Sequence, residues 1–418
     1  MNDLFQRLGL TLRRHIRFIG WLVLACVLGT GIGAVGSVFH HGIEWVTHLR
    51  LNHPWLLALL PVAGAVTALV YRVCGAADDG GTNRIFTCIR SGVPLRLRTA
   101  PLIFFSTLLS HLAGGSAGRE GAALQLGGSL AAWIGRVIRL EEKDRRIIVM
   151  CGMSACFTAM FGTPLTAAVF SLEVISVGMM YYAAIVPALC ASLVALLVST
   201  AMGSAPIAYA VTGVPGLTPV SMVQALVVGI GCALLAILFC KTLHIAPKLC
   251  GRIAKSAPMR GVVGGTVLLA LTLLLGTQLY NGAGSALIER AFAGQAVPWD
   301  FALKLLFTAI TIAAGMRGGE IVPTLATGAA FGGALAPVLG LSPSFGAALG
   351  MTALFCGVTN CPIASLLLSF ELFGSEGLPL FALCCFVSYA LSGYHSLYRE
   401  QKFVYSKSHA EQIDRNAQ

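Results

Sequence analysis

Charged side chains are scarce in this sequence. Asp, Glu, Lys and Arg make up 11% of its 418 residues, whereas soluble globular domains carry about 25%. Hydrophobic residues account for 56% of the chain, and the mean hydropathy is +0.82. This composition excludes an ordinary soluble domain and predicts an all-α protein that lies within a lipid bilayer.

Groupings of residues that would indicate an enzyme or a metal protein are also missing. The nine histidines show no pairing with a nucleophile, and His111 stands alone in an apolar segment, as core histidines usually do. The 13 cysteines lie mostly within apolar segments and lack metal-ligand spacing, so we expect reduced thiols. We therefore expect no enzyme, no metal site, no cofactor and no disulfide framework.

Long apolar runs, by contrast, are plentiful. A spanning helix needs about 20 apolar residues, so these runs allow roughly ten or more membrane segments, several of them tilted or incomplete. The 48 glycines favour close helix packing and breaks within helices. The first run is too long for a cleavable signal peptide and lacks a clean cleavage site. The runs cover residues 18–39, 55–71, 102–117, 147–202, 220–240, 262–279, 301–316 and 321–392.

The net charge of +11 does not indicate nucleic-acid binding. The basic residues form short clusters between apolar runs, and cytosolic loops of membrane proteins are rich in Lys and Arg. The N-terminus, the central linker and the C-terminal tail are therefore expected to face the cytosol of a bacterial inner membrane. The clusters are Arg7, Arg13, Arg14 and Arg17; Arg96 and Arg98; and Lys241, Lys248, Arg252, Lys255 and Arg260.

The sequence contains an internal repeat. The segment GMSACFTAMFGTPLTAAVFSLEV from Gly152 pairs with GMTALFCGVTNCPIASLLLSFEL from Gly350 at a constant offset of 198 positions. GREGAALQLGG from Gly118 and GGEIVPTLATG from Gly318 also correspond, 200 positions apart. Duplicated transporters build their substrate site where the two halves meet, from the ends of broken helices. We therefore expect the functional site at the junction of the repeats.

This duplication divides the chain into two membrane repeats. The first is expected at residues 18–203 and the second at residues 220–392, joined by a linker at 204–219 that bears Gly and Pro. A cytoplasmic segment at 1–17 is expected before them. A C-terminal helix and cytoplasmic tail are expected at 393–418, without a soluble regulatory domain.

Glu120 is the strongest candidate for a functional residue. An acid between apolar segments must be paired, protonated or directed at an aqueous path. Arg119 could neutralise it, but neighbouring residues on a helix point in different directions, so we expect Glu120 to face a path. Gly121, Ala122 and Ala123 would expose backbone N–H groups at a helix start, and such groups favour an anion. A free anion and the Glu120 carboxylate would compete for that position.

GREGA at 118–122 resembles the GREGP or GKEGP signature of the CLC chloride channels and chloride/proton exchangers. GGEIVP at 318–323 is similar to the GxFxP motif of this family, and FGTPLTAAVFSLEV is similar to the segment after its gating glutamate. Tyr398, in HSLY, falls where the family has its pore tyrosine, although an interfacial aromatic residue has the same sequence signature. The resemblance covers nearly the whole chain. It implies the CLC fold, with two inverted repeats of tilted and re-entrant helices, in a homodimer with one pore per subunit.

The resemblance also implies a mechanism. Glu120 would be the gating glutamate, which closes the path when it is ionised and swings away when it is protonated or displaced by chloride. Helix starts in both repeats would bind chloride through their backbone amides, and the pore tyrosine would donate a hydrogen bond to a central anion. The anion-binding residues implied in this way are Gly121, Ala122, Ile321, Val322 and Tyr398.

One departure from the family pattern concerns the first anion motif. GSGIP is replaced by Asp79, Gly80, Gly81, Thr82 and Asn83, so the serine and the proline are missing. Gly80 stands where the family has its chloride-binding serine. An anion would therefore depend on backbone amides around Gly80 and Gly81, or on Thr82.

A second departure concerns GxFxP. Ile321 replaces the phenylalanine, and Glu320 adds an acid beside the proposed anion site. Because only the neighbouring backbone N–H is needed there, we expect the Glu320 side chain to point away from the pore.

The choice between channel and exchanger rests on SLEV, residues 171–174. Exchangers of the family commonly carry two acids here, whereas this chain has Glu173 followed by Val174, which cannot carry a proton. We therefore expect a chloride channel, voltage-gated and acting as an electrical shunt for proton movement, with a chloride/proton antiporter as the alternative. Glu173 and its repeat partner Glu371 are expected to cap or brace helices.

Two other classes would need different residues. A transporter of organic solutes would show more polar and aromatic residues at the helix breaks, and a membrane enzyme would need a nucleophile with a base. The partners expected for this chain are chloride, the lipid bilayer and a second copy of itself, and no nucleic acid.

Overall fold

The protein is mostly helical, and its first helix is unusually long. The computed structural model describes the backbone of residues 2–77 and 79–418 and the side chains of residues 15–77 and 79–418. The side chains of Arg7, Arg13 and Arg14, in the expected cytoplasmic segment, lie outside the described residues. Helix α1 spans Asn2–Asn52, so it runs without interruption through the boundary expected at residue 17.

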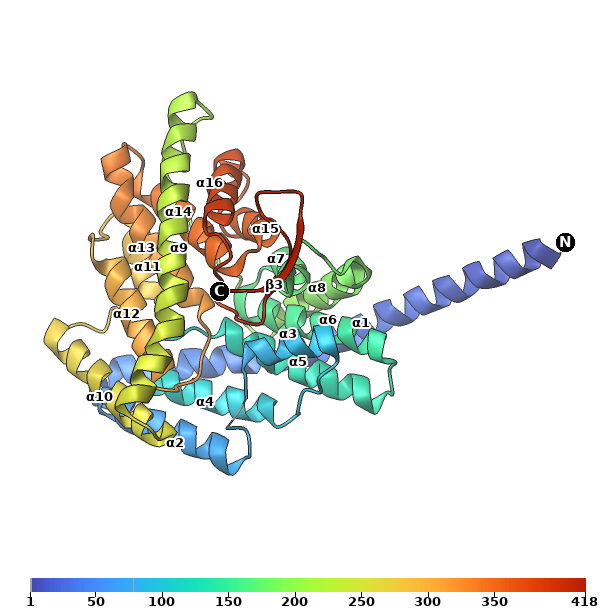
Figure 1. Ribbon diagram of the computed structural model, residues 1–418, viewed down its shortest axis with the longest axis horizontal. Coiled ribbons are helices and arrows are strands. Elements are labelled where there is room, and N and C mark those ends of the chain that lie inside the picture. Colours follow the sequence, from blue (N-terminus) through green and yellow to red (C-terminus); the bar gives the residue numbers. More distant parts are fainter. Residues whose placement is uncertain (1, 78) are drawn as a thin grey trace.

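The two halves of the chain each contribute a set of helices. In Figure 1, α1 to α6 lie across the lower part of the view and α13 to α16 lie across the upper part. The first half contains α1, η1 (Pro54–Leu59), α2 (Leu60–Val73), α3 (Thr82–Ser91), α4 (Thr99–Ala113), α5 (Glu120–Val137), α6 (Glu142–Phe161), α7 (Pro164–Glu173), η2 (Tyr182–Ala184) and α8 (Ile185–Ala201). The second half contains α9 (Pro219–Ile253), α10 (Ala257–Leu275), α11 (Ser285–Phe292), α12 (Asp300–Ala313), α13 (Ile321–Leu335), η3 (Ala336–Leu339), α14 (Pro343–Thr359), α15 (Pro362–Phe373) and α16 (Leu378–Leu391).

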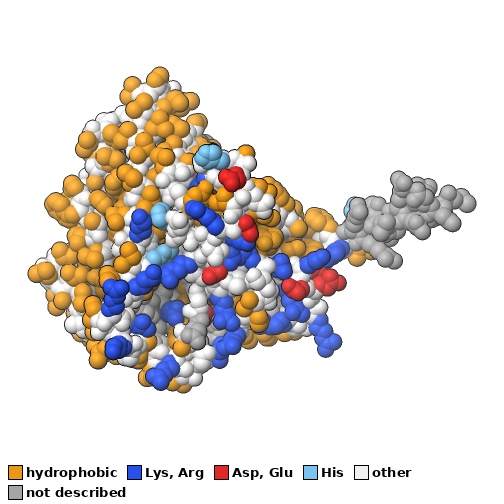
Figure 2. Space-filling model, viewed as in Figure 1, with side chains coloured by type: hydrophobic (Ala, Val, Ile, Leu, Met, Phe, Trp, Pro, Cys, Tyr) orange, Lys and Arg blue, Asp and Glu red, His pale blue; other side chains and the backbone are white. Residues whose placement is uncertain are grey.

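Several of these helices can cross a membrane. Six segments of the described chain are long and apolar enough, namely His15–Asn52, Pro54–Val73, Tyr182–Ala201, Pro219–Ile253, Ala257–Leu275 and Ile321–Leu339. Helices α4, α14, α15 and α16 are apolar but shorter, which fits the incomplete segments predicted from the sequence. Apolar side chains cover much of the surface in Figure 2, whereas Lys and Arg gather over the centre and lower part of that face.

Within each half, glycines bring two helices into close contact, at equivalent places of the repeat. A Cβ atom at Gly127 in α5 would collide with the carbonyl oxygen of Gly152 in α6. At the corresponding place in the second half, a Cβ atom at Gly328 in α13 would collide with the carbonyl oxygen of Gly350 in α14. Small residues at a helix interface allow such an approach, and packing of this kind holds membrane helices together.

Helices α7 and α15 are joined by two equivalent acids. Glu173, at the end of α7, accepts hydrogen bonds from Ile363 N (3.2 Å) and Ala364 N (2.9 Å) at the start of α15. Glu371, in α15, accepts from Leu165 N (2.8 Å) and Thr166 N (2.9 Å) at the start of α7. Each carboxylate therefore satisfies free amides at the start of the partner helix. The prediction that both acids cap or brace helices is confirmed.

The structure of the C-terminal segment differs from the sequence prediction. Residues 393–418 contain strands β2 (Lys402–Tyr405) and β3 (Gln412–Asn416) and not the expected helix. Strand β2 pairs in parallel with β1 (Ser176–Val177), and β3 pairs antiparallel with β2. Lys407, between β2 and β3, donates to Asn360 Oδ1 (2.5 Å), to the Tyr389 carbonyl (2.7 Å) and to Ser392 Oγ (3.1 Å). These tertiary contacts hold the tail against the helical bundle in an extended form.

Candidate functional site

The two repeats meet at the loops that precede α5 and α13. Gly118 N donates a hydrogen bond to the Gly319 carbonyl (2.6 Å), and Gly319 N donates to the Gly118 carbonyl (2.7 Å). A Cβ atom at Gly319 would collide with the backbone nitrogen of Gly121, so this approach requires glycine. The loops contain the two Gly-x-Glu motifs, so these motifs lie together where the repeats meet.

The Glu120 side chain lies at this junction. It is fully buried, and its Oε2 atom accepts a hydrogen bond from Arg119 N (3.0 Å). The backbone amides of Glu120 and Val322 also lie against the carboxylate. The carboxylate is therefore surrounded by amides from the starts of α5 and α13. Amides at helix starts favour a negative charge, so a small anion would fit the position that the carboxylate holds.

Arg119 lies closer to Glu120 than the sequence indicated. Its Nε atom is 3.5 Å from Glu120 Oε1, and its Nη2 atom is 3.5 Å from the Met160 carbonyl. The expectation that the two side chains point apart is wrong, because Arg119 precedes the first turn of α5 and its side chain folds back over the carboxylate. The ion pair is loose, since Glu120 Oε1 has no hydrogen-bond partner.

Glu320 holds the equivalent position in front of α13 but points elsewhere. Its Oε2 atom lies 3.4 Å from the place a Cβ atom would take at Gly121, and Thr82 Oγ1 lies 3.7 Å from the same place. The expectation that this side chain points away from the candidate anion site is therefore wrong. Glycines at 121 and 319 let the two loops touch, and the Glu320 carboxylate lies beside this contact. Ile321 and Val322, which follow it, are buried.

The segment that replaces the first anion motif is only partly available to an anion. Gly80 is exposed, and Gly81 N is already bonded to Asp79 Oδ1 (3.2 Å). Thr82 is buried against α5, where its hydroxyl donates to the Gly121 carbonyl (3.4 Å) and accepts from Gln125 Nε2 (3.3 Å). Of the three residues named from the sequence, Thr82 alone is buried beside the start of α5.

Tyr398 lies close to both acids. Its side chain is 2% exposed, and its hydroxyl has no hydrogen-bond partner among the described residues. The ring packs edge-on against Phe86, with 5.0 Å between the ring centroids. Glu120 and Glu320 both lie within electrostatic reach of the hydroxyl. A buried hydroxyl needs a partner, so this group is available to donate a hydrogen bond to an anion between the two carboxylates.

Val174 lies away from these groups, at the end of α7. Its side chain is buried, and its carbonyl accepts a hydrogen bond from Gln401 Nε2 (2.8 Å). Gln401 also donates to the Thr359 carbonyl (2.7 Å). The C-terminal segment thus covers this end of α7 and places an amide beside Val174, not an acid.

Two polar residues near the site were not identified from the sequence. Gln125 lies one turn after Gly121 on the same face of α5, and it is the lone amide in an apolar helix start. Lys304 is fully buried in α12 and donates to Ser116 Oγ (2.9 Å) and to the carbonyls of Tyr280 (3.1 Å) and Gly282 (2.8 Å). The available signals were the one amide side chain in α5 and the one charged side chain in the apolar run at 301–316.

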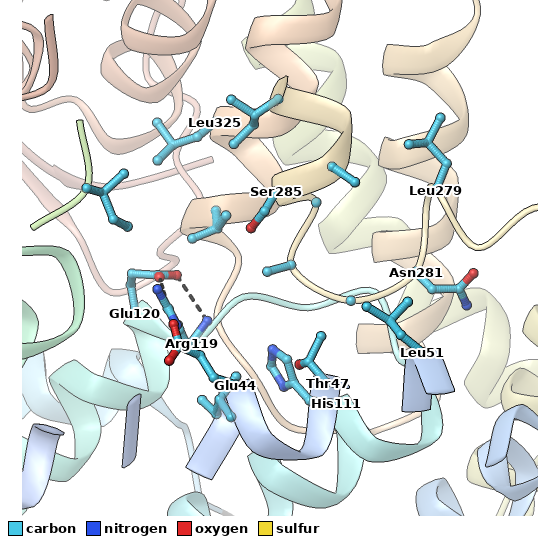
Figure 3. Close-up of a pocket in the computed structure, with 18 of the residues that line it drawn as sticks. Glu44, Thr47, Leu51, His111, Arg119, Glu120, Leu279, Asn281, Ser285 and Leu325 are labelled. Carbon is cyan, nitrogen blue, oxygen red and sulfur yellow. Dashed lines mark hydrogen bonds and ion pairs between the residues drawn. The ribbon is translucent and has the colours of Figure 1, made fainter. Parts of the chain in front are cut away.

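A cavity of about 270 Å³ opens beside Glu120. Figure 3 shows Glu120 and Arg119 at one side of it, Thr47 and Glu44 of α1 and His111 of α4 along another, and Ser285 and Leu325 opposite. His111 is therefore part of a cavity wall, whereas the sequence suggested an isolated core residue. Gly80, Gly81 and Thr82 do not line this cavity, whereas Glu120 does.

Fold and site together define a class of protein. Two sets of helices, related by an internal repeat, direct helix starts at a buried acid inside an apolar bundle, as membrane transporters of small anions do. The chain belongs to the CLC family: the sequence model described as voltage gated chloride channel matches residues 62–393. Members of this family are anion channels and transporters in multi-pass membrane form, and the predicted family and fold are confirmed.

Individual relatives cover nearly the whole chain. A protein of Pseudomonas syringae pv. tomato described as "Chloride/fluoride channel protein" is 37% identical over 398 residues, which cover 93% of this chain and 88% of that protein. A crystal structure of a CLC-type fluoride/proton antiporter has a TM-score of 0.89 and 32% identity, covering 93% of this chain and 99% of that one. The structure of a slow cyanobacterial Cl⁻/H⁺ antiporter has a TM-score of 0.77, covers 89% of this chain and 94% of that one, and at 19% identity supports the fold alone.

Proposed function

We propose that this protein exchanges fluoride for protons across a bacterial inner membrane. The observation that carries the proposal is the position of the Glu120 carboxylate among amides from two helix starts. An anion can take that position only after the carboxylate leaves, and protonation makes the side chain leave more easily. The likeness to a fluoride/proton antiporter and to a chloride/fluoride channel protein supports fluoride as the anion.

The second acid supports exchange more than passive conduction. Glu320 and Thr82 both lie beside Gly121, and Glu120 and Glu320 both lie within electrostatic reach of the Tyr398 hydroxyl. A proton could therefore move along the same path as the anion by binding to one carboxylate and then to the other. This removes the need for a second acid at Val174, on which the channel expectation depended.

The same residues support fluoride as the preferred anion. Fluoride is the most basic halide and the strongest hydrogen-bond acceptor among them, so it gains most from a protonated carboxyl group and a free hydroxyl. Glu320, when protonated, and Tyr398 would be two such donors. The family serine that binds chloride is absent at Gly80, and Gly80 is exposed.

A fluoride or chloride channel is the second candidate function. It is favoured by Val174, which leaves the end of α7 without a second acid. A channel would move anions without moving protons in a fixed ratio. Voltage gating and a role as an electrical shunt would accompany this candidate.

The assembly and orientation are part of the proposal. Helices α8, α15 and α16 carry apolar side chains on their outer faces that a second copy could cover in a homodimer, namely Val186, Leu193, Leu197, Ile363, Phe370, Phe386 and Leu391. The face of Figure 2 that is rich in Lys and Arg would lie in the cytosol, together with both termini.

Flux measurements in liposomes test the proposal. Purified protein is reconstituted with an outward fluoride gradient, and fluoride release and proton uptake are recorded together. The proposal predicts a fixed ratio of fluoride to protons that persists when the membrane potential is changed. Fluoride release without proton uptake would favour the channel, and absence of fluoride and chloride release would refute both candidates.

A further inference from the structure

The cavity beside Glu120 is lined by polar groups that the proposed exchange cycle does not use. Its wall includes Arg50 from α1 and His111 from α4, which are 3% and 1% exposed. Both side chains leave one polar atom without a partner among the described residues, Nε of Arg50 and Nε2 of His111. Glu120 Oε1, an acceptor in the same wall, is likewise unpaired. Buried polar atoms are seldom left unpaired, so the unpaired nitrogens of Arg50 and His111 point to a ligand.

The existing hydrogen bonds of Arg50 and His111 determine which further hydrogen bonds each side chain can make. Arg50 Nη1 donates to Gln278 Oε1 (2.9 Å), which leaves its Nε–H as a free donor. His111 Nδ1 lies 2.9 Å from the Thr107 carbonyl. A carbonyl only accepts, so Nδ1 carries a hydrogen and Nε2 of the neutral ring is a bare lone pair. Once the ring is protonated, Nε2–H becomes a second donor.

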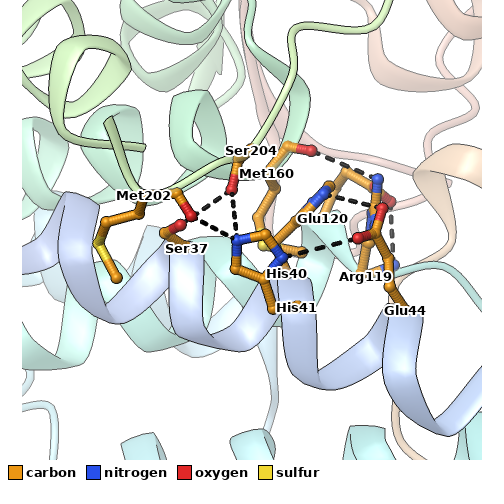
Figure 4. Close-up of polar contacts among 9 residues, drawn as sticks. All are labelled: Ser37, His40, His41, Glu44, Arg119, Glu120, Met160, Met202 and Ser204. Atoms are coloured by element: carbon orange, nitrogen blue, oxygen red, sulfur yellow. Dashed lines mark hydrogen bonds and ion pairs between the residues drawn. The ribbon is translucent and has the colours of Figure 1, made fainter. Parts of the chain in front are cut away.

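The charges around the cavity are not balanced. Lys304, just behind the wall, bonds to Ser116 and to two carbonyls, and no acidic side chain of the described chain pairs with it or with Arg50. Each acid of the cavity wall already lies beside a basic side chain. Glu44 lies 3.0 Å from His40 Nε2, as Figure 4 shows, and Glu120 lies 3.5 Å from Arg119. Two buried cations without a counter-charge are costly, and an anion in the cavity would offset that cost.

We propose that Arg50 and His111 form a second binding site for a small monovalent anion, outside Glu120, and that binding of the anion draws a proton onto His111. For the identity of the anion, fluoride, the inference rests on the proposed function. The anion accepts a hydrogen bond from Arg50 Nε–H and one from the protonated His111 ring. The proton comes from the solution that fills the cavity.

The link between anion and proton follows from the charges that face His111. Arg50, Arg119 and Lys304 all lie near enough to repel a protonated ring. An anion beside the ring cancels much of this repulsion, so His111 holds its proton only while the anion is bound. The remaining ionisable groups that line the cavity or lie at its edge are Glu44, His48, Glu120, Tyr209 and His40.

This site would give the cavity a role in exchange. An anion that leaves the Glu120 position would pass to Arg50 and His111 before it reaches bulk water. The proton that it draws onto His111 would then be available inside the cavity, beside Glu120. Anion release and proton delivery would thus take place in one compartment.

Proton uptake on anion binding tests the inference, with the double variant Glu120→Gln/Glu320→Gln as the starting protein so that neither acid can contribute. The purified double variant is placed in weak buffer at neutral pH, sodium fluoride is added, and the pH change is converted to protons per subunit. We expect uptake of a measurable fraction of one proton. His111→Asn added to this protein should abolish most of it, because Asn can still donate to the Thr107 carbonyl but offers no group in place of Nε2.

Two further variants serve as controls. His48→Asn removes an exposed histidine of the same cavity and should leave the uptake unchanged, whereas Arg50→Lys should reduce it together with the fluoride affinity. Equal uptake with and without His111 would refute the second site, provided that the variants elute as the same folded species in size-exclusion chromatography. The proposed function fails independently if the wild-type protein shows no proton-coupled fluoride flux.

Discussion

The two halves of this molecule share two pairs of equivalent acids, and one pair is symmetric whereas the other is not. Glu173 and Glu371 do the same work in both repeats, since each holds two amides at the start of the partner's helix. Glu120 and Glu320 also belong to equivalent Gly-x-Glu motifs, at the first residue of α5 and just before α13, yet Glu120 is buried among amides and Glu320 lies beside Gly121 and Thr82. The repeat therefore preserves the scaffold and allows the pathway to become asymmetric.

The largest effect is expected for Glu120. Replacing it with Gln removes the proton carrier and the charge that competes with the anion, so proton movement should fall by about 100-fold while anion flux continues. Parallel recordings of fluoride release and proton uptake from liposomes measure both quantities. Glu173→Gln is the matched control, because it changes a buried acid of the scaffold and should leave the coupling intact. Equal loss of coupling in both variants would remove the distinction between the two pairs.

Substitutions of Glu173 and Glu371, the acids that brace the helices, should lower stability by similar amounts. Gln at position 173 or 371 keeps one acceptor oxygen but loses the charge, and a hydrogen bond to a charged group contributes about 1.5–3 kcal/mol. We therefore expect each substitution to lower the free energy of unfolding by about 1–3 kcal/mol, by similar amounts for both. Thermal unfolding in detergent, followed by fluorescence, measures the shift. A large effect at one position and none at the other would contradict equivalent capping.

Substitution of Glu320 should slow transport and leave the stability of the protein unchanged. Glu320→Gln keeps the size of the side chain and removes a titratable group from the position beside Gly121. We expect fluoride/proton exchange to slow by about tenfold, which is less than the roughly 100-fold or greater loss typical of a removed proton-transfer group, because Glu120 still binds protons. Initial rates at several pH values measure this, with Glu376→Gln, another acid of the second half, as the control. Unchanged rates would assign Glu320 to the scaffold.

The smallest effect is expected at Tyr398. Tyr398→Phe removes one hydrogen bond to the anion, and such a bond contributes about 0.5–1.5 kcal/mol, which corresponds to about a two- to tenfold loss of fluoride affinity. Calorimetric titration with fluoride measures the change. Because Tyr389 is also partly buried but lies at the end of α16, Tyr389→Phe should leave the affinity unaltered. An unchanged affinity in Tyr398→Phe would separate this hydroxyl from the anion.

Patterns that depend on composition and on the repeat were accessible from the sequence. The two Gly-x-Glu motifs and the equivalence of Glu173 and Glu371 predicted where the halves meet and which acids brace helices. Features that depend on side-chain direction were not accessible. Arg119 folds back over Glu120, and Glu320 points inward, because both residues precede a helix and are not bound by helical geometry.

Long-range contacts explain the other differences. The tail at 393–418 forms strands because β1, more than 200 positions earlier, supplies an edge and Lys407 finds acceptors on three separate residues. Arg50 and His111 belong to different segments of the chain and meet at one cavity only after folding. In the sequence, His111 is a lone histidine in an apolar run, and this does not indicate that Arg50 lines the same cavity.

The dependence of fluoride binding on pH tests the central claim most directly, that Glu120 and the anion compete for the same amides. Affinity is measured by calorimetry for the wild-type protein and for Glu120→Gln between pH 5 and pH 8. In the wild-type protein the affinity should weaken by up to about tenfold per pH unit where the carboxyl group ionises, since one proton is linked to each anion. In Glu120→Gln it should be tighter at high pH and depend less on pH. Identical pH dependence in both proteins would contradict the claim.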